Sequence, residues 1–211
     1  MRTSFNEAIE DTRLDVVRLG ALAGDAIHSA VNALDRRDVE LAARVIAGDD
    51  QLDDLARKIS DECLELIWRQ QPVAGDLRHV AAMMQIAIDL ERVGDYAVSI
   101  SKKSIRLAET PIRPARVEVG RIAALALDLL REAMVAYTER DATIASRVIE
   151  MDDEVDRLYH RSIATLEEEM QADSGVVKSG ALMLFVLASL ERVGDRAQNV
   201  AWHTKEMLGV P

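Results

Sequence analysis

A six-residue string, Leu-Glu-Arg-Val-Gly-Asp, occurs at residues 90–95 and again, unchanged, at residues 190–195 of this 211-residue chain. The similarity extends beyond the string, because nine of twenty positions are identical between residues 81–100 and 181–200. Each copy spans about a hundred residues, whereas solenoid repeats span roughly 20 to 50. The sequence therefore predicts two similar structural units in tandem.

The composition favours helices. Apolar residues make up 49% of the chain but aromatic residues only 3%. The apolar content is therefore largely alanine, leucine and methionine, which are strong helix formers, together with valine and isoleucine. We expect an all-α fold. The net charge of −11 opposes contact with the phosphate backbone of nucleic acids, so we expect no nucleic-acid partner.

Apolar residues recur at spacings of three and four through six long segments, as a buried helical face requires. Asp38 and Asp76 stand where a side chain can cap the next helix, and Arg140-Asp141 repeats the turn at residues 37–38. The predicted helices cover residues 5–34, 39–69, 76–107, 115–137, 142–170 and 176–208.

The only stretch with two prolines, residues 110–114, separates the third predicted helix from the fourth. We therefore predict a first domain over residues 1–110 and a second over residues 111–211. Long helices joined by short turns run antiparallel, so each domain is expected to be a three-helix bundle. The third helix of each is apolar nearly all round, at residues 80–88 and 181–188, which predicts that these two helices are central and pack together.

Several features predict a cytoplasmic protein. The single cysteine, Cys63, excludes an internal disulfide and fits a reducing compartment. Residues 1–11 are polar and acidic, unlike a secretory signal. The longest apolar run, residues 181–190, is about half the ~20 residues that a membrane span needs, so we expect no insertion into the membrane.

Acidic pairs repeat with the units and form the candidate site. Glu91 and Asp95 are four residues apart, as are Asp49 and Asp53, so each pair shares one helix face. Like charges in apolar surroundings are costly unless a cation compensates them. We expect the bundle to bring four carboxylates around one point in each unit, and the acidic stripe of the last helix to continue to an asparagine. The candidate metal ligands are Asp49, Asp53, Glu91, Asp95, Asp152, Asp156, Glu191, Asp195 and Asn199.

Ligand sets made only of oxygen suit hard or borderline cations. The sequence leaves the metal open among divalent or trivalent ions of iron, zinc, manganese, magnesium or calcium. In the alternative interpretation the carboxylates pair with arginines, Glu91 with Arg92 and Asp49 with Arg44 or Arg57, and the chain is a helical scaffold without a functional metal. A metalloenzyme is disfavoured, because no histidine or other acid–base group accompanies the carboxylates in both units, so we expect no enzymatic activity.

Three kinds of segment stand out together: the two copies of the six-residue string, the Arg-Val-Ile-x-x-Asp segments at 44–49 and 147–152, and Gln-Pro-Val-Ala-Gly-Asp-Leu-Arg at 71–78. As a set, and in this order, they resemble the PhoU family of phosphate-uptake regulators. The resemblance covers nearly the whole chain. The second unit replaces the segment at 71–78 with the shorter residues 173–176, so any role of the former applies only to the first unit.

This resemblance implies a pair of three-helix bundles and a bacterial, cytoplasmic, non-enzymatic protein. It further implies a negative regulator of phosphate uptake and of the phosphate-starvation response, acting as an adaptor between the ATPase of the Pst phosphate transporter and its sensor histidine kinase. The acidic motifs of the family fall on Glu91 with Asp95 and on Glu191 with Asp195, and in some members they bind multinuclear metal clusters. We also expect the chain to form a homodimer.

Overall fold

The computed structural model describes residues 2–110 and 117–210, and for residues 2–4 and 152 it describes the backbone alone. This part of the chain contains six α-helices and no strand, which confirms the all-α prediction. The helices are α1 (Arg2–Arg36), α2 (Val39–Gln70), α3 (Gly75–Ala108), α4 (Val119–Glu139), α5 (Ala142–Ala172) and α6 (Val177–Leu208), and the short 3₁₀ helix η1 (Ser174–Val176) precedes α6.

The two units turn into their second helices in the same way. Arg37 and Arg140 both have a φ of 54°, in the left-handed region, and each ends the first helix of its unit. The next residues, Asp38 and Asp141, cap α2 and α5 by accepting hydrogen bonds from backbone N–H groups of the first turn. These turns agree with the predicted helix starts.

The start of α3 differs from the prediction. Its N-cap is Ala74, with a φ of 46° and no side-chain cap bond, whereas Asp76 lies inside the first turn. There its carboxylate still favours the helix, because it faces the positive end of the helix dipole. The described part of α4 begins at Val119. The predicted start of this helix at 115 and the predicted domain boundary fall on residues 111–116, outside the described residues.

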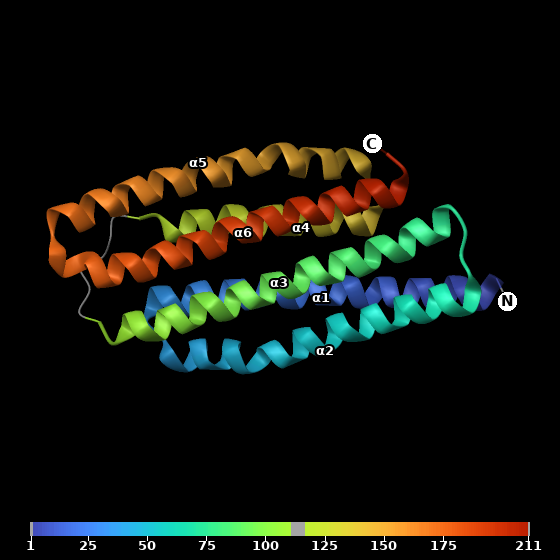
Figure 1. Cartoon of the computed structure of the whole chain (residues 1–211), viewed down its shortest axis with the longest axis horizontal. Coiled ribbons are helices and arrows are strands. Elements are labelled where there is room, and N and C mark those ends of the chain that lie inside the picture. Colours follow the sequence, from blue (N-terminus) through green and yellow to red (C-terminus); the bar gives the residue numbers. More distant parts are fainter. Residues whose placement is uncertain (1, 111–116, 211) are drawn as a thin grey trace.

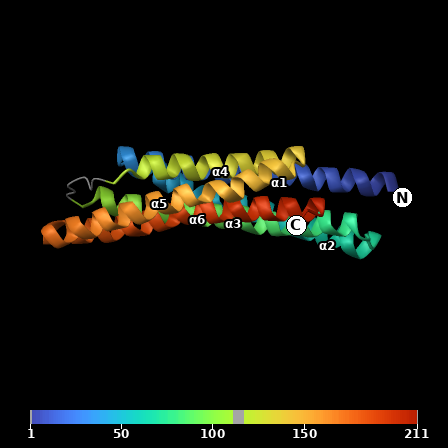
Figure 2. The same cartoon turned by 90° about the horizontal axis from the view of Figure 1, so that it is seen from above.

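Four helices form one layer, in the order α2, α3, α6, α5 (Figure 1). Helices α1 and α4 cover one face of this layer, α1 over α2 and α3, and α4 over α5 and α6 (Figure 2). Helices α3 and α6 run antiparallel at the centre and pack extensively against each other. The prediction that the third helices of the two units meet at the centre is therefore confirmed.

The core is one continuous apolar cluster to which all six helices contribute. Equivalent positions of the repeated string, such as Leu90 and Leu190, are completely buried. The third helices are nevertheless not enclosed on every side, because the face of the layer away from α1 and α4 exposes large apolar side chains. Ile88 is 46% exposed, Phe185 62% and Trp202 44%.

Among the described helices, none combines the length and the apolar character that crossing a membrane requires.

Candidate functional site

The acidic pairs of the first unit lie on facing helices, Asp49 and Asp53 on α2 and Glu91 and Asp95 on α3, and all four side chains are half-buried. The two helices approach closely at Gly94. A Cβ atom at this position would lie 3.3 Å from Oδ1 of Asp49 and 3.1 Å from a side-chain methyl of α2. The glycine of the repeated string therefore lets the carboxylates of α2 come against α3.

Burial and repulsion between neighbouring carboxylates disfavour the charged forms of Asp49 and Glu91. The pKa of Asp49 is raised by burial first, and then by the charges of Asp53 and Asp95. The pKa of Glu91 is raised by burial and by Asp95, with smaller contributions from the two aspartates of α2, while Arg92 opposes the shift. The four groups therefore interact as one site, at which a bound cation would relieve the repulsion.

An arginine already compensates part of this charge. Nη1 of Arg92 donates to Oδ2 of Asp95 at 2.8 Å, and its Nε lies 3.6 Å from Oε2 of Glu91. The Arg92 side chain is 54% exposed, however, so solvent screens both contacts. Arg57, the other nearby candidate, pairs with Asp54 instead of Asp49.

The carboxylates face one another without forming a closed ligand shell. Among the side chains that the structure describes, which do not include that of Asp152, no three His, Cys, Asp or Glu groups converge closely enough to hold a metal ion. A groove of about 290 Å³ runs beside the site, lined by residues that include Asp53, Glu91 and Arg92. The donor chemistry fits a hard cation, but binding one would require side chains to rotate toward it.

The second unit repeats the arrangement where it is described. Asp156 on α5 faces Asp195 on α6, and Glu191 lies one turn before Asp195. Burial raises the pKa of Asp195. The positive charges of Arg196 and Arg192 lower this pKa, the negative charge of Asp156 raises it, and the net shift is upward. The side chain of Asp152, the remaining predicted ligand from α5, lies outside the described residues.

Asn199, the last predicted ligand, belongs to a different cluster of polar side chains. Its Nδ2 donates to Oδ1 of Asp89 on α3 at 3.2 Å. Asp89 is only 7% exposed, and Nη1 of Arg196 and Nε2 of His203 also reach it, at 3.0 and 3.4 Å. Three donors of α6 therefore surround one buried carboxylate of α3.

Sequence reasoning missed this buried cluster. The available signal was Asp89 itself, a charged residue directly before the repeated string in an apolar helix, where the second unit has Ser189. Its partner Arg196 is 107 residues away in the chain, so spacing could not connect them. Burial raises the pKa of Asp89, but hydrogen bonds from His203, Asn199 and Arg196 outweigh this and leave it lowered.

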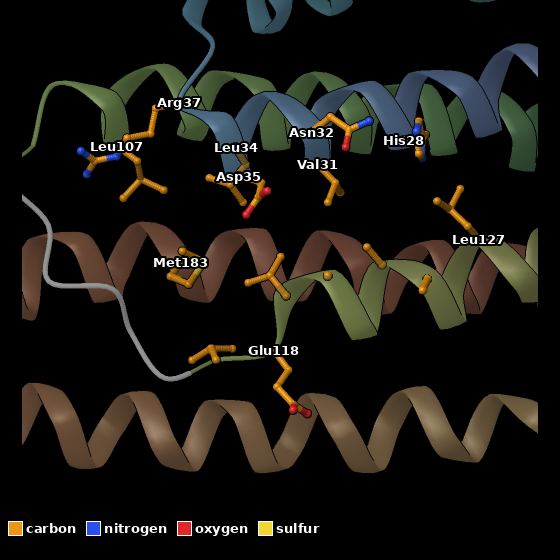
Figure 3. A pocket seen from close by; sticks show the side chains of 15 residues that line it. His28, Val31, Asn32, Leu34, Asp35, Arg37, Leu107, Glu118, Leu127 and Met183 are labelled. Atoms are coloured by element: carbon orange, nitrogen blue, oxygen red, sulfur yellow. The ribbon is translucent and has the colours of Figure 1, made fainter.

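A separate groove of about 780 Å³ lies between the end of α1 and the start of α4. Figure 3 shows Asp35 of α1 and Met183 of α6 on its facing walls, with His28 farther along α1. The lining is mainly apolar and includes Val117 and Glu118, which directly follow residues 111–116.

Comparison with known proteins agrees with this repeated architecture. The PhoU domain matches twice, at residues 16–104 and 119–203, one match for each unit. The chain belongs to the PhoU family. It is 36% identical to a phosphate-specific transport system accessory protein PhoU homolog from Pseudomonas aeruginosa, over 93% of this chain and 82% of that protein. A homolog of the same name from Aquifex aeolicus is also 36% identical, over 87% of this chain and 83% of the relative.

Solved structures of the family share the fold. The crystal structure of PhoU from Pseudomonas aeruginosa aligns with a TM-score of 0.93 at 34% identity, covering 97% of this chain and 99% of that one. PhoU from Streptococcus pneumoniae aligns with a TM-score of 0.85 at 24% identity, covering 97% and 96%, which supports the fold alone. Membership in the family, inferred from the repeated segments of the sequence, is therefore confirmed.

Proposed function

We propose that this chain is an accessory protein of a phosphate-specific transport system, which restrains phosphate uptake and the phosphate-starvation response when phosphate is plentiful. The observation that carries the proposal is the match of the family to both units, at residues 16–104 and 119–203. Relatives that carry the accessory-protein name align over most of their own length, as in the 82% covered in Pseudomonas aeruginosa.

In this proposal the chain acts in the cytoplasm as a non-enzymatic adaptor, as a homodimer, between the transporter ATPase and a sensor histidine kinase. An adaptor needs surface that its own fold leaves free. The uncovered face of the four-helix layer supports this role, because it exposes Ile88, Phe185 and Trp202. Large exposed apolar side chains are common in surfaces that bind proteins.

We further propose that each acidic site binds a metal ion. Asp49, Asp53, Glu91 and Asp95 would hold it in the first unit, and the equivalent residues in the second. A bound cation would supply positive charge beside Asp49 and Glu91, whose charged forms burial and repulsion disfavour. It would thereby hold α2 against α3, and α5 against α6.

The cellular role is tested by expression in a bacterium whose own PhoU gene has been deleted. We expect the chain to restore repression of a phosphate-starvation reporter in phosphate-rich medium. Affinity purification from cells grown with and without phosphate should recover the transporter ATPase and the kinase. A reporter that stays fully active despite normal amounts of the chain would overturn the proposal.

Metal binding is tested by elemental analysis after loading with each candidate ion. Asp95→Ala and Asp195→Ala should reduce the bound metal, and Asp50→Ala, which removes an exposed carboxylate next to the first site, should not. A cation that binds only the folded chain must also raise the melting temperature. Unchanged metal content in both variants would contradict the site.

The scaffold interpretation has one observation in its favour, the contacts of Arg92 with Asp95 and Glu91. It predicts that Arg92→Gln destabilises the chain and that divalent ions have no effect on its stability. The metal-binding interpretation predicts instead that divalent ions stabilise the chain, and that Arg92→Gln strengthens metal binding because a competing cation has been removed. Titration of this variant with metal therefore separates the two interpretations.

A further inference from the structure

The contact between α3 and α6 follows the internal symmetry of the chain, but its two halves differ in chemistry. Asp89 and Asn199 meet in one half, 3.2 Å apart. In the repeat, Asp89 corresponds to Ser189 and Asn199 corresponds to Ser99. The hydroxyl oxygens of these two serines meet in the other half of the contact, 3.3 Å apart. The two clusters can therefore be compared position by position.

One half holds a buried acid with its counter-ions, and the other retains a cation without the acid. Lys103 stands at the position equivalent to His203, which contacts Asp89. The position equivalent to Asp89 itself is Ser189. The exchange of aspartate for serine removes the carboxylate, whereas the exchange of histidine for lysine keeps a positive charge.

Lys103 is half-buried, and its hydrogen bond and its ring contact are both with neutral groups. Its Nζ donates to Oγ of Ser99 at 3.0 Å and lies 5.6 Å from the ring centroid of Phe185. The ion pairs found in the described part of the chain do not include this lysine. Burial lowers its pKa, and the nearby positive charges of Lys102 and Arg106 lower it further.

Solvent reaches this cluster. Phe185 is 62% exposed on the face of the layer that α1 and α4 leave uncovered, and Ser99 is half-buried. The Ser99 hydroxyl accepts from Lys103 at 3.0 Å and lies 3.3 Å from the hydroxyl of Ser189, which also contacts the backbone oxygen of Phe185 at 2.8 Å. Each hydroxyl has one hydrogen, so Ser99 can turn its hydrogen to a ligand while that of Ser189 serves the oxygen of Phe185, and the ammonium group of Lys103 has donors left beyond its bond to Ser99.

We propose that Lys103 and Ser99 bind a small oxyanion at the position where the other half of the contact holds the carboxylate of Asp89. Lys102 and Arg106 would add long-range attraction, which matters in a chain with a net charge of −11. The shared chemistry is that of a carboxylate or a phosphate, bound by charge-assisted hydrogen bonds. The proposal is independent of the function proposed above and of the acidic sites.

The test is thermal unfolding of the whole chain, freed of metal by a chelator, in inorganic phosphate or in chloride at equal ionic strength. The melting temperature of the wild type should rise with phosphate concentration. Lys103→Gln should weaken the apparent affinity by at least about tenfold, the cost of one lost charge-assisted hydrogen bond. Lys205→Gln is the matched control, because Lys205 is also half-buried and lies over the ring of Trp202, without a serine pair.

Ser189→Asp is a second, independent variant. It returns a carboxylate to the chain at the equivalent of Asp89, so it should raise the melting temperature in chloride and abolish the response to phosphate. Acetate in place of phosphate identifies the source: an equal response indicates a carboxylate ligand, and a weaker one indicates phosphate. Equal melting temperatures of the wild type in phosphate and chloride, or equal responses of Lys103→Gln and Lys205→Gln, would overturn the proposal.

Discussion

Asp89 shows how single residues give each half of this symmetric scaffold its own chemistry. A buried carboxylate is tolerated only where donors replace its water. Here Arg196, Asn199 and His203 supply those donors, all from α6. Breaking such a cluster by Asp89→Ala should lower the free energy of unfolding by about 3 kcal/mol, because Arg196 then loses its counter-ion and His203 keeps only Glu206.

The cluster also makes stability depend on pH through His203. Its hydrogen bond to Asp89 raises its pKa above the usual 6.5 despite burial, and Glu206 adds to the shift. Because folding raises the pKa of His203, its protonated form stabilises the folded state fully below about pH 6.5. This contribution is lost as the pH rises through the pKa of His203 in the folded state. Asp89, whose pKa is lowered from 3.8, contributes above that value and loses its contribution in acid.

We therefore expect His203→Gln to cost most stability between about pH 4 and pH 6.5, and progressively less as the pH rises above that range. Urea denaturation of the wild type and the variant across this range measures the difference. His160→Gln is the control, because His160 is exposed on α5 and contacts the backbone oxygen of Asp156 and the ring of Tyr159, which are neutral groups. A difference that stays constant with pH would show that His203 contributes by packing rather than by charge.

At the scale of the helices, local chemistry in the sequence was sufficient to predict most of the structure. Asp38 and Asp141 act through bonds to the next turn, so their cap roles could be read from the chain. Asp76 was misplaced as a cap because the residues before it, including Ala74 with positive φ, let the helix begin earlier than the aspartate. Such backbone conformations leave little signal in residue types.

Glycines inside helices test the close approach of α2 to α3. Gly48→Ala should raise the free energy of unfolding by up to about 1 kcal/mol, because no atom lies within 4 Å of the new methyl group and alanine favours the helix. Gly94→Ala should gain clearly less, because its methyl would lie 3.1 Å from Cδ2 of Leu52 and 3.3 Å from Asp49. Equal increases in the free energy of unfolding, measured by urea denaturation, would show that α2 can move away from Gly94 at no cost.

At the scale of the whole molecule, the repeat predicted the architecture, and the acidic site only in part. The repeat indicated two similar units, and the apolar segments at residues 80–88 and 181–188 were enough to place α3 and α6 at the centre. It also identified carboxylates that interact, including Asp49 with Asp95. The repeat did not predict that Arg92 would pair with Asp95 of the same string, because the rotamer of an arginine depends on side-chain packing and solvent exposure.

A further consequence of the central contact is that the two units should unfold together. They share one apolar core rather than two, because α3 and α6 pack directly against each other. The chain has one tryptophan in each unit, Trp68 and Trp202, so Trp68→Phe and Trp202→Phe each leave a reporter of one unit. We expect the fluorescence transitions of both variants in urea to coincide with the loss of helix measured by circular dichroism, as two-state unfolding requires. Separate midpoints would mean that the contact between α3 and α6 is weaker than the core of each bundle, and that the units behave as independent domains.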